Sequence, residues 1–172
     1  MGEADAGQSY GNLVVLAGGS RSESDPLKDA IKYVTDLAYQ KFQARNFEDK
    51  DIYFLSESEY HDLDGDGYDD KIVDDNSPTV SDMQDVLTDW AVKRDSDGPL
   101  YVYMADHGVK DRFMVATGEI LSSAKLDTAL DTFQQETGRE VVVIMEACYS
   151  GSFVDDLKSN IHDRVVMTSV NT

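Results

Sequence analysis

Residues 100–108 read LYVYMADHG, and residues 141–151 read VVVIMEACYSG. Each stretch begins with five or six apolar residues in a row, which is the pattern of a strand buried on both faces. Polar residues and a glycine follow directly in both cases. Three further apolar runs occur at residues 13–17, 51–55 and 164–168, so the sequence predicts five buried strands.

Segments with helical spacing of apolar residues separate these runs. Asp25 followed by Pro26 predicts the start of a helix, with Asp25 as the N-cap, and Ser81 predicts the N-cap of a second helix. Buried strands that alternate with helices are typical of a parallel sheet covered on both faces. We therefore predict an α/β fold, a three-layer αβα sandwich with a mainly parallel sheet. The predicted helices span residues 25–43, 81–90 and 123–136, and a small hairpin is predicted at residues 113–120.

The length and the charge exclude several classes of protein. The 172 residues suffice for one domain, and 15 basic against 34 acidic residues give a net charge of −19. Such a charge disfavours binding to nucleic acid or to an anionic membrane. No apolar run approaches the length of a membrane span, and no signal peptide is visible in this chain. The single cysteine excludes an internal disulfide.

The residues that follow the third and fourth predicted strands carry the chemistry. His107 follows one strand and Cys148 follows the other, and a right-handed crossover would place these two strands side by side. An imidazole near a thiol can take its proton and produce a thiolate nucleophile. The backbone N–H groups of Gly108 and Cys148 could then bind the oxyanion. Either side chain alone could instead be purely structural.

These two motifs resemble those of the caspase-like superfamily (clan CD) of cysteine peptidases, and most closely those of the legumain family. An apolar strand ending in Asp-His-Gly, then one ending in Glu-Ala-Cys-x-Ser-Gly, carries the resemblance. It implies a caspase-like sheet, a His107–Cys148 dyad, protein or peptide substrates and no cofactor for catalysis. It also assigns Asp106, Glu146 and Arg21 to the substrate-binding pocket.

The chain departs from the legumain pattern at three places. Legumains carry an asparagine and an arginine in the loop after the first strand, which orient the histidine and bind substrate, and this chain has Gly18-Gly19-Ser20-Arg21-Ser22-Glu23-Ser24 there. Legumains carry a glutamate directly after the cysteine, where this chain has Tyr149. The resemblance also implies a sixth strand and a pocket wall after the strand at residues 164–168. We therefore expect a single peptidase domain over residues 1–172 that lacks these parts, or a C-terminal remainder that forms a separate chain after self-processing.

An acidic insertion is predicted at residues 57–78. Nine acidic residues lie between Glu57 and Asp75 against one base, Lys71, and the centre of this segment has the pattern D-x-D-x-D-G-x-x-D. Carboxylates at positions 1, 3, 5 and 9 and a backbone carbonyl at position 7 form an oxygen cage suited to Ca²⁺. The predicted ligands are Asp62, Asp64, Asp66, Tyr68 and Asp70.

This predicted calcium loop is not a complete EF-hand, because position 12 is Val73 rather than a glutamate. A solvated acidic loop without a metal is the alternative interpretation. A structural Ca²⁺ would favour a secreted, periplasmic or cell-surface location, where free calcium is high.

Three functional hypotheses follow from the sequence. The first is a cysteine endopeptidase with a structural calcium ion. The second is a catalytically inactive, calcium-binding interaction module on the same fold. The third is a phosphate-binding loop at residues 18–22, which lacks the lysine and glycine spacing of known phosphate loops.

Overall fold

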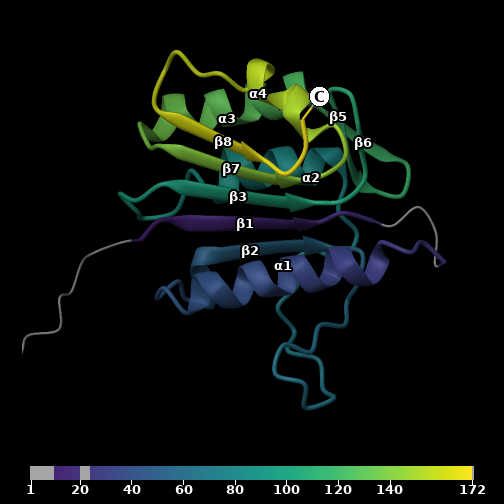
Figure 1. Ribbon diagram of the computed structural model, residues 1–172. Coiled ribbons are helices and arrows are strands. Elements are labelled where there is room, and N and C mark those ends of the chain that lie inside the picture. The colour runs from purple at the N-terminus through teal and green to yellow at the C-terminus, as the bar shows by residue number, and fades with distance from the viewer. Residues whose placement is uncertain (1–9, 20–23, 172) are drawn as a thin grey trace, which may run out of the picture.

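A parallel sheet forms the centre of the molecule (Figure 1). The computed structural model describes residues 10–19 and 24–171, and in these residues the sheet has five strands in the order β2-β1-β3-β7-β8. All neighbouring strands are parallel, which confirms the predicted sheet. The strands are β1 (Asn12–Ala17), β2 (Ile52–Ser56), β3 (Leu100–Ala105), β7 (Val141–Glu146) and β8 (Arg164–Thr168).

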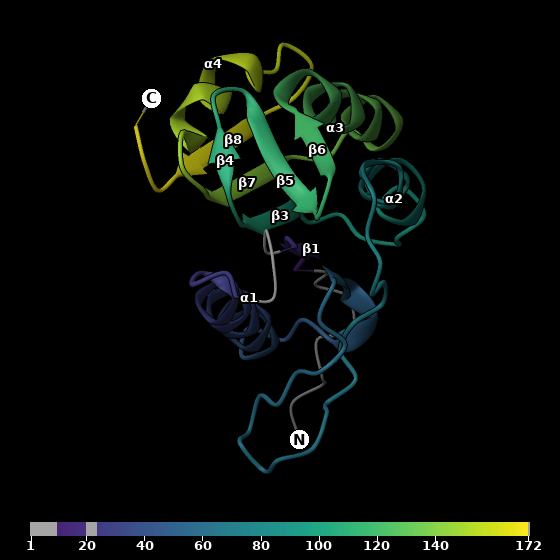
Figure 2. The same cartoon turned by 90° about the vertical axis from the view of Figure 1, so that its right-hand side faces the viewer.

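Helices cover both faces of this sheet, which confirms the three-layer sandwich (Figure 2). Helix α1 packs on one face through Ile31, Ala38 and Tyr39. The other helices pack on the opposite face around Phe133 and Phe153. None of the helices in the described part of the chain has the length and apolar character of a membrane span. The helices are α1 (Lys28–Gln43), α2 (Val80–Asp85), α3 (Ser123–Thr137) and α4 (Phe153–Asp156), and a π-helical turn, Val86–Trp90, extends α2.

A small antiparallel sheet follows directly after His107. It consists of β4 (Gly108–Val109), β5 (Arg112–Ala116) and β6 (Glu119–Ser122), in that order. The turn between β5 and β6 confirms the predicted hairpin, and β4 is an additional short strand. Figure 2 shows this sheet at the end of the main sheet where β3 finishes.

The predicted start of α1 was wrong. The helix begins at Lys28 with Leu27 at the N-cap position, so Asp25 lies outside it. The Asp25 carboxylate still accepts a hydrogen bond from the backbone N–H of Leu27, at 2.9 Å. This bond forms a turn before the helix, which is a common alternative use of an aspartate at such a place.

The predicted cap of the second helix was also wrong. Thr79, rather than Ser81, is the N-cap of α2, and it exchanges hydrogen bonds with Asp82 in a capping box. The end of α3 is as predicted, because Gly138 terminates it in the left-handed conformation with φ of 69°.

Candidate active site and acidic loop

The segments that carry His107 and Cys148 lie against each other. Strands β3 and β7 are direct neighbours, and the N–H of Asp106 donates to the carbonyl of Glu146 at 3.2 Å. A side chain at Gly108 would overlap the backbone carbonyl oxygen of Cys148, so only glycine permits this close packing. The structure therefore brings together the two strand ends whose proximity was predicted.

The chain after Cys148 turns sharply. Cys148 is exposed and has a free thiol, and Tyr149 adopts the left-handed conformation with φ of 58°. This conformation is costly for a bulky residue and needs support from its surroundings. Support comes from the segment after β8, because the N–H of Gly151 donates to the carbonyl of Val170 at 2.9 Å. The turn presents the cysteine at the surface, where a substrate can reach it.

The His107 imidazole is held by a buried carboxylate that was not predicted as a site residue. Its Nε2 lies 2.7 Å from Oδ2 of Asp25, and the Asp25 side chain is only 3% exposed. Among the described residues, Nδ1 of His107 has no hydrogen-bond partner. Asp25 follows the first strand, at the same sheet edge as His107, and this position was the signal that could have identified it.

Tyr103 and Glu146 form a second polar pair at this edge. The Tyr103 hydroxyl donates to Oε1 of Glu146 at 2.5 Å. Burial and the nearby Glu146 carboxylate raise the pKa of Tyr103 above its ordinary value, so the hydroxyl stays protonated. Tyr103 is buried, whereas Glu146 is exposed.

The other two residues assigned to the substrate pocket have different positions. Asp106 is 5% exposed, and its Oδ1 accepts a hydrogen bond from the N–H of His107 at 2.5 Å. A side chain at Gly18 would overlap the Asp106 carboxylate, so Asp106 lies beneath the chain that leaves β1. Arg21 lies outside the described residues.

A cavity of about 350 Å³ lies near this site but on the other side of β1. It opens where β1 and β2 end, next to the start of α1. His107 and Cys148 do not line it. Its polar lining comes mainly from Lys28, Asp29, Lys32, Ser56, Glu57, Ser58 and Thr117.

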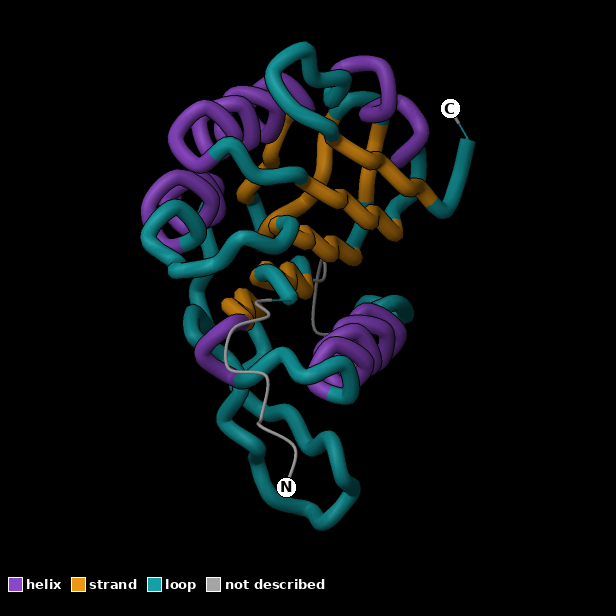
Figure 3. The backbone as a smooth tube through the Cα atoms, turned by 90° about the vertical axis from the view of Figure 1, so that its left-hand side faces the viewer, coloured by secondary structure: helices purple, strands orange, loops and turns teal. Residues whose placement is uncertain are grey.

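The acidic loop extends away from the sheet between β2 and α2 (Figure 3). Asp62, Asp64 and Asp70 each place a carboxylate oxygen within 4.8 Å of the others. Asp66 is not part of this group, and its carboxylate accepts a hydrogen bond from the N–H of Tyr68 at 2.8 Å. The structure thus brings together three of the four predicted carboxylate ligands.

The Asp62 carboxylate shapes the backbone of this loop. It accepts hydrogen bonds from the N–H groups of Gly65, Asp66 and Gly67, at 2.7 to 3.1 Å. Both glycines have positive φ, 78° and 87°, which other residues rarely adopt. The glycines therefore allow the chain to wrap around Asp62.

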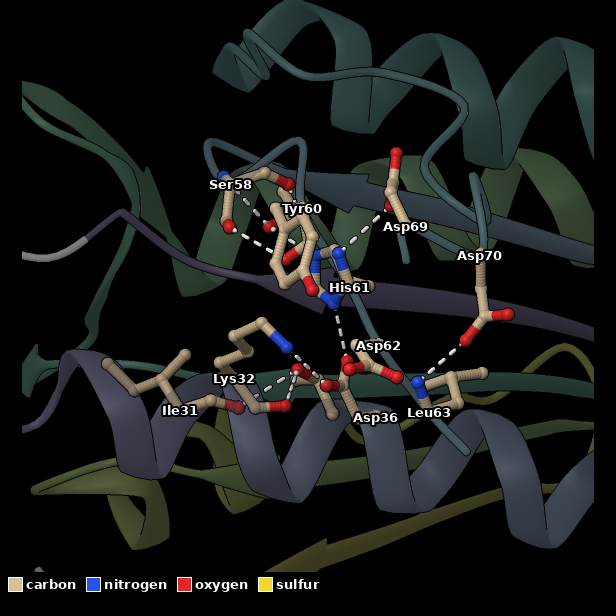
Figure 4. A network of polar contacts seen from close by, with 12 residues as sticks. Ile31, Lys32, Asp36, Ser58, Tyr60, His61, Asp62, Leu63, Asp69 and Asp70 are labelled. Atoms are coloured by element: carbon tan, nitrogen blue, oxygen red, sulfur yellow. Dashed lines mark hydrogen bonds and ion pairs between the residues drawn. The ribbon is translucent and has the colours of Figure 1, made fainter. Parts of the chain in front are cut away.

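His61 attaches the base of the loop to α1 (Figure 4). Its ring is fully buried, with Nδ1 2.5 Å from Asp36 of α1 and Nε2 3.1 Å from the carbonyl oxygen of Ser58. Asp36 also pairs with Lys32 at 2.8 Å, and the imidazole packs edge-on against Phe54. The loop is therefore anchored at its base, although most of its residues are exposed.

Comparison with known proteins gave one family match. The model of the peptidase C13 family matches residues 80–172, more than half of the chain, and this segment includes His107 and Cys148. No curated protein matches the chain. The matched segment begins after the acidic loop, so the loop and the first two strands lie outside it.

Proposed function

We propose that this chain, which belongs to the peptidase C13 family, is a cysteine endopeptidase in which Cys148 is the nucleophile. One observation carries the proposal. His107 and the exposed Cys148 follow neighbouring parallel strands, β3 and β7, and Gly108 packs directly on the cysteine backbone. A family of cysteine peptidases implies peptide bonds as the substrate.

Asp25 has a defined role in the proposed reaction. Its carboxylate accepts a hydrogen bond from the N–H at Nε2 of His107, which leaves Nδ1 unprotonated and available for the thiol proton. Asp25 does not react, but it selects the tautomer and stabilises the imidazolium that forms. This role also accounts for the burial of a carboxylate next to the His107 imidazole.

The proposed reaction then proceeds in two stages. The thiolate of Cys148 attacks the carbonyl carbon, and the N–H groups of Gly108 and Cys148 stabilise the resulting oxyanion. The C–N bond breaks, and His107 gives its proton to the leaving amine. A water molecule, deprotonated by His107, next attacks the thioester and releases the acid product and the free thiol.

Thiol labelling tests this function without knowledge of the substrate. Iodoacetamide should alkylate Cys148 faster than it alkylates an ordinary cysteine, and His107→Ala should slow that reaction. His162→Ala, which changes an exposed histidine elsewhere, should leave the rate unchanged. A peptide library should be cleaved by the unmodified chain and not by Cys148→Ala. Slow alkylation that does not depend on His107, together with an uncleaved library, would contradict the proposal.

We also propose that the acidic loop binds a structural Ca²⁺ ion. The convergence of Asp62, Asp64 and Asp70 supports this, because three carboxylates so close together repel one another without a cation. A location outside the cytosol would supply enough calcium to fill such a site. The alternative function, a calcium-dependent interaction module without activity, shares this loop and differs only in the thiol chemistry above.

Thermal unfolding tests the calcium proposal. Calcium at about 100 times its dissociation constant should add about 2.7 kcal/mol to the free energy of unfolding, which raises Tm by roughly 5–10 °C. Asp64→Asn should abolish most of this gain. Asp66→Asn, the matched change outside the three-carboxylate group, should retain more of it. An unchanged Tm at millimolar calcium would contradict the calcium proposal and would indicate a solvated acidic loop without a bound metal.

A further inference from the structure

The cavity at the ends of β1 and β2 is separate from the candidate active site. Its volume of about 350 Å³ lies within the range of pockets that hold small molecules, and neither His107 nor Cys148 lines it. It opens at the carboxyl edge of the parallel sheet, where ligands commonly bind in open α/β sheets. Ala17 and Ile31, which are 3% and 8% exposed, give it an apolar floor. The proposed peptidase reaction makes no use of this space.

The charge of this cavity differs from that of the whole molecule. In the described part of the lining, Lys28 and Lys32 balance Asp29 and Glu57, whereas the chain carries a net charge of −19. A local balance of both signs in a strongly acidic protein favours a ligand that also carries both signs. It disfavours a multiply charged anion, which the surrounding carboxylates would repel.

The backbone of the loop after β1 does not hold an anion at its first two residues. The N–H of Gly18 donates to the carbonyl of Ala105 at 3.0 Å, and the N–H of Gly19 donates to that of Val115 at 3.2 Å. A bound phosphate would need such N–H groups. Residues 20–22 of the predicted phosphate-binding loop lie outside the described residues. In the described part of the chain, charged side chains rather than these N–H groups therefore determine which ligand the cavity takes.

The cationic end of the cavity lies on α1. Lys28 and Lys32 are one helical turn apart, on the same face of the helix. Lys32 also pairs with Asp36 at 2.8 Å, as Figure 4 shows, and its ammonium group has further N–H groups to donate. The partial positive charge at the start of a helix adds to that of the two lysines. This end of the cavity is therefore suited to a carboxylate.

The anionic end of the cavity lies toward the small antiparallel sheet. The Glu57 carboxylate accepts hydrogen bonds from the N–H and the hydroxyl of Thr117, both at 3.4 Å, in the turn between β5 and β6. A side chain at Gly19 would overlap the same carboxylate, so Glu57 lies against the chain that leaves β1. These contacts hold an exposed carboxylate in place, and such a group is suited to an ammonium ion.

We propose that this cavity binds a small zwitterion, a free amino acid or a dipeptide, with its carboxylate at Lys28 and Lys32 and its ammonium group at Glu57. An apolar side chain on the ligand would contact Ala17 and Ile31. The site shares no residue with the proposed catalytic machinery, so its test is independent of the proposed peptidase function.

Calorimetric titration tests the proposal with L-leucine and with the dipeptide leucyl-leucine. At least one of them should bind saturably, and the comparison shows whether the site takes a free amino acid or a dipeptide. The N-acetylated form of each compound lacks the ammonium group, and the amide form lacks the carboxylate. Each blocked form should bind about tenfold more weakly than its parent, the loss expected from one charge-assisted hydrogen bond. Equal binding of a blocked form, or no saturable binding at millimolar concentrations, would overturn the proposal.

Two variants assign the two charges of the ligand to the two ends of the cavity. Lys28→Gln should weaken binding of the zwitterion about tenfold and leave the affinity for the amide form unchanged. Glu57→Gln, which can still accept hydrogen bonds from Thr117, should weaken binding of the zwitterion and leave the affinity for the N-acetylated form unchanged. Lys41→Gln, which changes an exposed lysine in the last turn of α1, should have no effect. Unchanged affinity in both cavity variants, or equal losses for all forms of the ligand, would overturn the proposal.

Alkylation distinguishes this site from the candidate active site. Protein treated with iodoacetamide, in which Cys148 is blocked, should bind the zwitterion with unchanged affinity, because Cys148 does not line the cavity. Loss of binding after alkylation would place the ligand at the candidate active site and overturn the inference. Binding by a chain that cleaves no peptide would support the cavity site and contradict the proposed peptidase function.

Discussion

The candidate active-site edge and the acidic loop are assembled in different ways. At the edge, Asp25, His107 and Cys148 come from three distant parts of the sequence, and the parallel sheet brings them together. In the loop, the carboxylates lie within residues 62–70, and hydrogen bonds to their own backbone shape the segment. One site depends on the sheet and the other on local turns.

This difference indicates which mutations should affect only one of the two regions. The described contacts between the two regions include α1, where His61 bonds to Asp36 while Asp25 lies just before the first turn, and Glu57, which accepts hydrogen bonds from Thr117 at the turn between β5 and β6. A change at the loop should therefore alter stability or calcium binding and leave the thiol chemistry intact. A change at the strand ends should do the opposite, and the first two predictions below test this separation.

The largest effect is expected for Asp25→Asn. The variant can still accept the hydrogen bond from Leu27, but its amide would donate to Nε2 of His107 and force the wrong tautomer. We expect kcat/KM for peptide cleavage to fall by about 10²–10⁴-fold, the range for such a change in a catalytic triad. The effect of calcium on Tm should not change.

Asp29→Asn is the control for this prediction, because Asp29 is exposed in the first turn of α1. It should retain full activity. An active Asp25→Asn variant would show that Asp25 holds the helix start rather than the imidazole.

An intermediate effect is expected for His61→Ala. This change leaves a cavity beside Phe54 and removes the buried bond to Asp36. The free energy of unfolding should fall by about 2–4 kcal/mol, as measured by urea denaturation. The rate of Cys148 alkylation should remain that of the unmodified chain.

The exposed His162→Ala variant should change stability by less than about 0.5 kcal/mol. A large drop in the rate of Cys148 alkylation for His61→Ala would contradict the independence of the two regions. It would show that the loop and the candidate active site form one cooperative unit.

The smallest effect appears only at alkaline pH. Burial raises the pKa of Tyr39 on α1 and of Tyr103 on β3, each helped by a carboxylate that accepts a hydrogen bond from the tyrosine hydroxyl. Above pH 10 the unfolded tyrosines ionise while the folded ones stay protonated. Stability should therefore fall as pH rises, by up to about 1.4 kcal/mol per pH unit for each tyrosine, and should not depend on these groups below pH 9.

Urea unfolding at pH 9 and pH 11 measures this slope. Tyr39→Phe and Tyr103→Phe should each make it shallower, because each removes one tyrosine whose ionisation is suppressed in the folded state. The exposed Tyr33→Phe should leave the slope unchanged. A slope that neither variant changes would contradict this prediction.

The sheet and the positions of His107 and Cys148 were predictable from the sequence. Apolar runs mark the strands, and the polar residues that follow each run mark where the strand ends. Asp25 was misassigned because its signature, an aspartate before Pro26, is the same for a helix cap and for a residue that reaches another segment. The hydrogen bond of Tyr103 was not predicted, because in the sequence Tyr103 is one more residue of an apolar strand. Sequence spacing carries no information on which distant group its hydroxyl meets.

The acidic loop shows a different limit. The spacing indicated that Asp62, Asp64, Asp66 and Asp70 converge, and three of them do. Asp66 turns instead to the backbone N–H of Tyr68, two residues ahead, which is a common bond for an aspartate in a turn. Which carboxylates converge therefore depends on side-chain rotamers, which spacing alone does not determine.

The parallel order of the sheet also determines when the proposed catalytic residues can meet. Strand β1 pairs with β3, so Asn12 cannot pair before Leu100 has been synthesised. In the same way, β3 cannot pair with β7 before that later strand exists. Folds with such high contact order form slowly, because distant segments must meet before any pairing is rewarded. During synthesis on the ribosome, His107 therefore emerges long before Cys148 exists beside it. Until the strands between them have paired, a nascent chain cannot hold the His107 imidazole near the Cys148 thiol.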